Sequence, residues 1–121
     1  MKLTIYGDVP SKKNSKQIFR NRATGKPFIK SSERYEAWHR QALPQLHRTP
    51  RAKDITAIAI CFYPATKRRS DLTNKAESIM DLLVDAGVIE DDNWFVVPDI
   101  HPKFGGVDKE NPRAEVEIIS N

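Results

Sequence analysis

Four stretches of the chain have apolar patterns that predict β-strands. Residues 55–63, ITAIAICFY, are apolar on both faces of an extended chain, which is typical of a central strand covered on both sides. Alternating positions predict shorter strands at residues 2–6 and 114–118, and a further strand is expected at residues 94–100. The stretch 103–112, which contains two neighbouring glycines, is expected to be a loop.

Apolar residues at helical spacing predict two helices. The first follows Ser31 or Ser32, either of which can cap it, and covers about residues 33–43. The second begins at Asp71 or Ser70, either of which is a good N-cap, and ends at Gly87, which can adopt a left-handed conformation. Its apolar stripe consists of Leu72, Ala76, Ile79, Met80 and Leu83, and its polar row consists of Asn74, Glu77 and Asp81.

A β-hairpin is predicted before the first helix, where residues 17–20 and 27–30 flank a short turn that contains Gly25. Its basic residues are Arg20, Arg22, Lys26 and Lys30. We interpret the hairpin as an arm that faces DNA. The alternative is an exposed edge hairpin that carries charge to avoid aggregation.

The order of these elements predicts an α/β (α+β) fold in one small domain over residues 1–121, with two main helices packed against a mixed β-sheet and the basic hairpin added. No apolar run approaches the roughly 20 residues of a membrane span, and residues 1–10 lack the apolar core of a signal peptide. The only cysteine, Cys61, lies in an apolar run and is expected to be a buried thiol in a reducing cytoplasm.

Charge is distributed unevenly along the chain. Residues 1–69 contain 16 Lys or Arg and 4 Asp or Glu, a net charge of +12, whereas residues 70–121 contain 4 and 12, a net charge of −8. A basic half can follow a phosphate backbone, and an acidic half can gather metal. The alternative, which needs no ligand, is that the two halves attract each other, within one subunit or across a dimer.

Residues 67–93 combine both charges around the second helix. Three cations directly precede Asp71, and three acids follow the end of the helix. Carboxylates beside cations predict a Mg²⁺ site next to a phosphate-binding patch, because Mg²⁺ is held by one or two carboxylates together with substrate phosphates. A solvated helix with acids that favour its N-terminus is the alternative. The polar, basic loop at residues 11–16 can also contact phosphates.

The motifs in these stretches resemble the RusA family of Holliday-junction resolvases, which are endodeoxyribonucleases common in phages and prophages. The matching residues are Lys67-Arg68-Arg69, Asp71-Leu72-Thr73-Asn74, Ala86-Gly87 and Asp91-Asp92, with Pro10–Ser15 and Lys109–Arg113 similar to the phage branch. The resemblance implies a cytoplasmic enzyme of a bacterial or phage-infected cell that uses Mg²⁺, or Mn²⁺ in its place, to resolve four-way junction DNA by paired symmetric nicks in recombination and repair.

The resemblance also implies roles for single residues. Asp71 and Asp92 match the metal-binding acids, and Asp91 is a supporting group. Two positions depart from the family pattern, because Thr73 stands where the family has its second acid and Glu77 stands where it has a lysine. We hypothesise that Glu77 supplies the missing acid and Lys75 the missing cation. The residues expected to bind DNA are Lys12, Lys13, Asn14, Lys16, Lys67, Arg68 and Arg69.

A symmetric nick on a nearly two-fold junction also implies a homodimer with two-fold symmetry. Candidate residues for the dimer contact are Val84, Val88, Ile89, Trp94 and Phe95. No nucleotide cofactor is expected, because the chain has no Gly-rich nucleotide loop or Walker motif. His39 and His47 have no metal-ligand partners at a useful spacing in the sequence.

Three alternatives to this interpretation stay open. The departure at Thr73 would suit a catalytically weak or inactive protein that binds branched DNA. The acidic half would suit a regulator that binds a basic protein, and the same acids would suit a flap or restriction nuclease.

Overall fold

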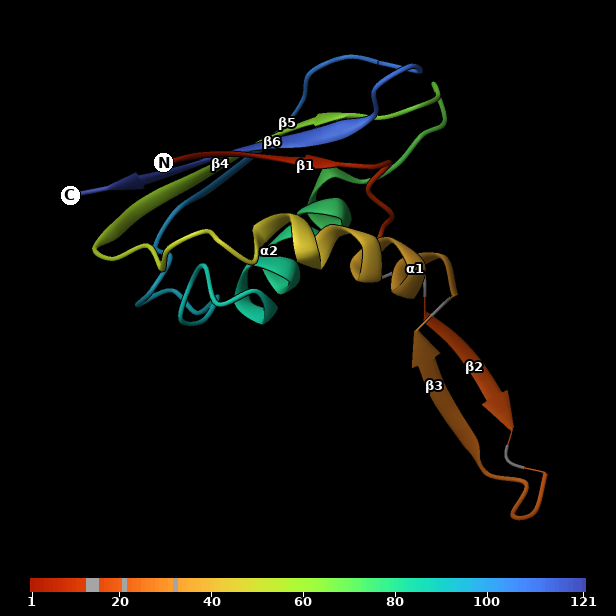
Figure 1. Cartoon of the computed structure of the whole chain (residues 1–121). Coiled ribbons are helices and arrows are strands. Elements are labelled where there is room, and N and C mark those ends of the chain that lie inside the picture. The colour runs from red at the N-terminus through yellow and green to blue at the C-terminus, as the bar shows by residue number, and fades with distance from the viewer. Residues whose placement is uncertain (13–15, 21, 32) are drawn as a thin grey trace.

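The computed structural model describes residues 1–12, 16–20, 22–31 and 33–121 of the chain, with the backbone alone for residues 16–20 and 27–31. A four-stranded sheet carries two helices on one face, and a separate two-stranded hairpin projects away from this body (Figure 1). The predicted α+β class, with helices against a mixed sheet and a hairpin, is confirmed.

The four-stranded sheet has the order β1-β6-β4-β5. Its strands are β1 (Lys2–Tyr6), β4 (Ile55–Tyr63), β5 (Ile100–Phe104) and β6 (Arg113–Ser120). β6 is antiparallel to both β1 and β4, whereas β4 and β5 are parallel. β4 therefore has a partner on each side, as its apolar sequence predicts. The last strand, β6, lies between the first strand and β4.

The helices are α1 (Glu33–Ala42), which continues into a 3₁₀ turn at Leu43–Leu46, and α2 (Leu72–Asp85). Both agree with the helical spacing. Gly87 ends α2 with a φ of 74°, a left-handed conformation that glycine adopts without strain. None of the helices among the described residues is long and apolar enough to cross a membrane.

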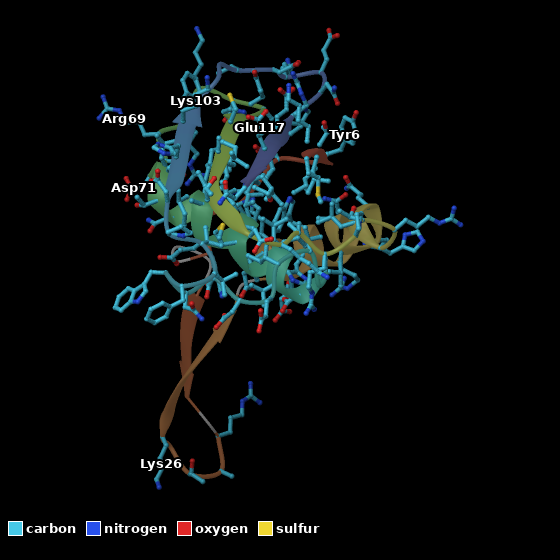
Figure 2. The ribbon with its side chains drawn as sticks, turned by 90° about the vertical axis from the view of Figure 1, so that its left-hand side faces the viewer. Tyr6, Lys26, Arg69, Asp71, Lys103 and Glu117 are labelled. Atoms are coloured by element: carbon cyan, nitrogen blue, oxygen red, sulfur yellow. The ribbon has the colours of Figure 1, made fainter. Side chains whose placement is uncertain are left out.

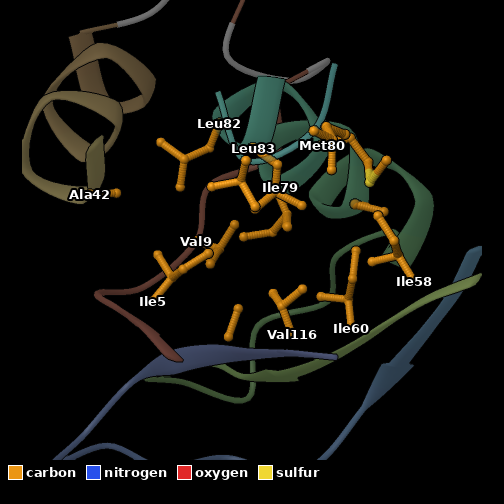
Figure 3. Packing of buried hydrophobic residues seen from close by; sticks show 14 of the residues in the cluster. Ile5, Val9, Ala42, Ile58, Ile60, Ile79, Met80, Leu82, Leu83 and Val116 are labelled. Atoms are coloured by element: carbon orange, nitrogen blue, oxygen red, sulfur yellow. The ribbon is translucent and has the colours of Figure 1, made fainter. Parts of the chain in front are cut away.

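The hydrophobic core fills the space between the sheet and the two helices (Figure 3). Its fully buried side chains come from the inner faces of β1, β4 and β6 and from the apolar stripe of α2. Members shown in Figure 3 include Ile5, Ile58, Ile60, Ile79, Leu83 and Val116. Burying such an aliphatic side chain contributes about 1.5–3 kcal/mol, so this layer fixes the position of α2 on the sheet.

The prediction that β4 is covered on both faces is wrong. Both helices lie on the same side of the sheet (Figure 1), and Ala57, Ala59 and Cys61 on the other side are only half-buried. The reason is that alanine and cysteine expose little apolar surface, so a strand can be apolar on both faces without a second covering layer. Cys61 is accordingly a half-buried thiol rather than a buried one.

The strand expected at residues 94–100 is also wrong. The chain turns after Asn93, whose side-chain Oδ1 accepts hydrogen bonds from the backbone N–H groups of Phe95 at 3.0 Å and Val96 at 3.2 Å. Asparagine favours such turns because its side chain can bond the backbone ahead of it. The strand starts only at Ile100 and continues to Phe104, so it takes the first residues of the stretch expected to be a loop.

The predicted hairpin is confirmed as β2 (Lys16–Arg20) paired antiparallel with β3 (Pro27–Ser31). Figure 2 shows Lys26 at its far tip, well away from the sheet and helices. Of the residues expected to bind DNA, Lys13 and Asn14 lie outside the described residues, and Lys16 is described by its backbone alone.

Candidate metal and DNA-binding site

The N-terminus of α2 positions Asp71. This residue is the N-cap by its extended backbone, but its side chain makes no capping hydrogen bond to the helix. Its Oδ2 instead accepts a hydrogen bond of 3.1 Å from the buried side-chain amide of Asn74. The prediction of a side-chain cap is therefore wrong. Asn74 orients an exposed carboxylate, and Figure 2 shows Asp71 at the same end of the molecule as Arg69.

A cavity on the polar side of α2 brings two of the predicted acids together. It is lined by Lys12, Glu77, Met80, Asp81 and Asp92. Glu77 and Asp81 are one helical turn apart, and Asp92 reaches the cavity from the segment after α2. We call this the acidic cavity. Asp71 does not line it, so the structure joins Glu77 to Asp92 and leaves Asp71 at the start of the helix.

The Glu77 and Asp92 carboxylates are both available to a ligand. Both residues are exposed, and among the described residues no hydrogen bond or ion pair engages the Glu77 side chain, whereas the Asp92 side chain interacts with that of the neighbouring Asp91. The neighbouring Asp91 is different, because the backbone N–H of Asp92 and the side chain of Asn93 each donate to it at 2.8 Å and lower its pKa. Asp91 thus holds the turn that presents Asp92.

Sequence analysis missed Asp81 as part of this site. Its carboxylate accepts a hydrogen bond of 2.5 Å from the Tyr35 hydroxyl and lies 3.1 Å from the Lys12 ammonium. Burial of Asp81 acts to raise its pKa, but the hydrogen bonds from Tyr35 and Lys12 outweigh burial and hold the pKa below its ordinary value of 3.8. Burial, and then the contact with Asp81, raise the pKa of Tyr35, which stays a hydrogen-bond donor.

Replacing Tyr35 with phenylalanine is expected to lower the free energy of unfolding by about 1 kcal/mol near neutral pH, because a hydrogen bond to a charged acceptor is lost. Asp81 has a depressed pKa in the folded state, so the contribution of this contact is present above the ordinary value of 3.8 and is lost as pH falls through the folded-state pKa. Urea unfolding across this range measures it. The exposed Tyr6 gives the control, Tyr6→Phe. Equal stability of Tyr35→Phe and the native protein would contradict the expectation.

Asp81 also belongs to a second cluster, which the sequence did not reveal. His39 Nε2 lies 2.8 Å from Asp85 Oδ2, and one ligand atom from each of His39, Asp81 and Asp85 lies within 4.8 Å of the others. The expectation that His39 has no metal-ligand partners is therefore wrong. Helix α2 supplies Asp81 and Asp85 at a four-residue interval and α1 supplies His39, but the two helices meet only in the folded chain. One imidazole and two carboxylates suit Zn²⁺ or Mn²⁺ better than Mg²⁺.

A second cavity lies at the start of α2 and is mainly basic. It is lined by Asp8, Pro10, Ser11, Arg34, Pro64, Thr66, Arg68, Arg69, Ser70 and Lys75, and we call it the basic cavity. Arg68 and Arg69 are exposed and have no ion-pair partner among the described residues. Their positive charge is therefore available to an anion such as a backbone phosphate. Lys67 is exposed but does not line this cavity.

Lys75 lies in the basic cavity and not in the acidic one. Its ammonium group donates a hydrogen bond of 2.7 Å to the backbone carbonyl of Val9, and burial lowers its pKa. Two functions thus lie on different sides of one helix, because Lys75 faces the cations while Glu77 and Asp81 face the acidic cavity. The contact also ties the segment before the hairpin to α2.

Comparison with known protein families decides how this arrangement is classified. The family model described as "Endodeoxyribonuclease RusA" matches residues 8–119, nearly the whole chain. The chain belongs to the RusA family. RusA-family membership implies an endodeoxyribonuclease that resolves Holliday junctions, with junction DNA as the ligand. A search of curated proteins gave no match.

The RusA match spans both cavities, the hairpin and the turn that carries Asp91 and Asp92. Such nucleases generally use a divalent metal, and the exposed carboxylates around the acidic cavity provide the hard oxygen donors that Mg²⁺ and Mn²⁺ accept. Thr73, at the family's second acid, is exposed at the start of α2. It supplies a hydroxyl but no charge.

Proposed function

We propose that this RusA-family chain is a divalent-metal-dependent endonuclease that nicks four-way junction DNA in symmetric pairs as a homodimer. The observation that carries the proposal is the meeting of two exposed carboxylates, Glu77 and Asp92, at one cavity. Asp71 lies at the N-terminus of α2 and adds a third exposed carboxylate beside the cations.

In this proposal Asp92 and Glu77 hold the metal at the acidic cavity, and Asp71, which does not line the cavity, is assigned to the metal from its match to the family motif. The metal when bound would activate water and stabilise charge on the phosphoryl group. Asn74 keeps the Asp71 carboxylate in place through its 3.1 Å hydrogen bond. Asp91 fixes the turn that presents Asp92.

The basic cavity would hold a phosphate that flanks the scissile bond. Arg68 and Arg69 supply its free positive charges, and Lys75 adds a third cation from α2. Lys75 would then neutralise developing charge on the phosphate that the basic cavity holds. Lys12 would act at the acidic cavity, beside Asp81. The remaining residues proposed to contact DNA are the cations Lys13, Lys16 and Lys67 and the neutral hydrogen-bonding residue Asn14.

The homodimer follows from the near two-fold symmetry of the substrate, since two symmetric nicks require two equivalent sites. Two of the residues suggested for the contact, Val88 and Ile89, are fully buried inside the subunit and are excluded. Trp94 and Phe95 are exposed, and Val84 is half-buried.

The test of this function is nicking of a labelled four-way junction by the native protein in Mg²⁺, in Mn²⁺ and in EDTA. Paired nicks at symmetric positions that need the metal support the proposal. Tight junction binding without nicks in either metal would favour the alternative of a catalytically inactive protein that binds branched DNA. The uncharged Thr73 is the observation that favours this alternative.

Replacing Thr73 with aspartate is expected to strengthen metal binding about 10-fold, because it restores a carboxylate at the position where the RusA family has one. The nicking rate at limiting Mn²⁺ measures this effect. Thr73→Asn, which changes the shape without adding charge, is the matched control. An unchanged metal dependence in Thr73→Asp would mean that Glu77 already completes the site.

A further inference from the structure

Two neighbouring aromatic side chains, separated from Asp92 by one residue, are almost uncovered. Trp94 is 76% exposed and Phe95 is 90% exposed. Their ring centroids lie 6.2 Å apart, with the ring planes inclined at 65°. Large apolar side chains that stand together on a surface indicate a binding site, because leaving them in water forgoes the benefit of burial.

The backbone holds this aromatic pair in a fixed turn. The Asn93 carbonyl accepts hydrogen bonds from the N–H groups of Val96 at 3.1 Å and Val97 at 2.9 Å, and the Asn93 side chain bonds to Phe95. Val97 is 4% exposed and anchors the turn in the core. The exposure of the two rings is therefore built into the fold. Because Asn93 also donates to Asp91, the same turn fixes the pair relative to the acids.

We propose that Trp94 and Phe95 stack against DNA bases at the branch point of the junction, beside the phosphate that is cut. This inference rests on the proposed nuclease function. Two residues span at most about 7 Å, and successive nucleotides in a strand lie about 3.4 Å apart. A base one or two steps from a phosphate at Asp92 is thus within reach. At a branch point the stack of base pairs is interrupted, so aromatic side chains can cover the exposed base faces.

Cations near the pair offer contacts to a DNA backbone. Phe95 borders a cavity that is lined by two cations, Arg51 and Lys53, and by two acids, Asp54 and Glu90. Lys53 has no ion-pair partner among the described residues. These cations can hold phosphates next to a stacked base. A second copy of the chain that covered the patch would bring its own Asp91 and Asp92 near those of the first, and like charges that face each other cost affinity. Toward a DNA phosphate, the metal that Asp92 is proposed to hold offsets this negative charge.

The intrinsic fluorescence of the protein tests this inference. The chain has two tryptophans, and Trp38 is buried with 5% exposure, so quenching by acrylamide reports mainly on Trp94. In EDTA, which prevents nicking, a four-way junction is expected to protect Trp94 from acrylamide several-fold. A linear duplex of the same length is expected to give little protection.

The double variant Trp94→Ala with Phe95→Ala is expected to bind the junction about 5- to 30-fold more weakly, with little change in duplex binding. Trp94→Phe should keep most of the affinity, since a phenyl ring can still stack. Phe104→Ala is the matched control, because Phe104 is a 59% exposed aromatic residue on β5.

Three outcomes would overturn the inference. If Trp94 stays open to acrylamide while labelled junction is bound, the pair does not stack on bases, and the nuclease function is untouched. If Trp94 becomes protected as protein concentration rises without DNA, and the double variant sediments as a monomer, a second copy covers the pair. If the native protein does not prefer junction over duplex, the proposed function fails together with the inference.

Discussion

Replacing Asp71 or Asp92 with asparagine is expected to reduce nicking of a four-way junction in Mg²⁺ by about 10²- to 10⁴-fold, while junction binding persists. Each substitution keeps the shape of the side chain and removes the charge that we propose holds the metal, which would stabilise the phosphoryl group during cleavage. Quantitative gel analysis of nicked strands, with binding followed separately by fluorescence anisotropy in EDTA, measures the two effects. Glu77→Gln is expected to reduce nicking as well, because Glu77 lines the same cavity as Asp92.

Asp99→Asn is the matched control for these acid substitutions. Asp99 is an exposed acid that pairs with His101 at 2.8 Å and lines neither cavity. The Asp99→Asn variant should nick the junction at the native rate. If Asp71→Asn keeps full activity while Asp92→Asn loses it, the metal is held at the acidic cavity alone, and Asp71 has no part in the chemistry.

The second large effect is expected on DNA affinity. Replacing both Arg68 and Arg69 with alanine should weaken binding about 30- to 100-fold near physiological salt, on junction and duplex alike, because each removed phosphate contact lowers the number of counterions released. The slope of log affinity against log salt should become less negative by about 2 for the double variant. Titrations at several salt concentrations provide both values.

Arg48→Ala removes the same charge from an exposed position outside the basic cavity. It should change affinity far less than either Arg68→Ala or Arg69→Ala. An Arg48 variant that weakens binding as strongly as the cavity variants would mean that net charge, and not the basic cavity, governs affinity.

Periodicity predicts an element well when its apolar residues face one compact core. β4 and α2 have the expected bounds because both pack their apolar stripe into the same layer. β5 was misplaced for a local reason, since the hydrogen bonds of Asn93 fold residues that are apolar enough for a strand into a turn. The open outer face of β4 was missed because alanine and cysteine do not reveal whether anything covers them.

The candidate site was predictable in its residues but not in its grouping. The motif around Asp71 and the acids after α2 identify the family, yet spacing alone does not reveal that Glu77, and not Asp71, shares a cavity with Asp92. His39 and Asp85 are 46 residues apart and meet only because α1 packs beside α2. Such pairs depend on how the two helices pack against each other, and a local pattern in one sequence does not reveal this packing.

The place of β6 in the sheet has a consequence for how the chain folds. β6 is the last strand in chain order, yet it lies between β1 and β4 and pairs with both. During synthesis, β1 and β4 have no antiparallel partner until residues 113–120 have left the ribosome. Pairing across the whole length of the chain carries a high cost of loop closure. We therefore expect slow folding that follows translation. The unpaired edges and apolar side chains of β1 and β4 would stay exposed to chaperones until β6 inserts between the two strands.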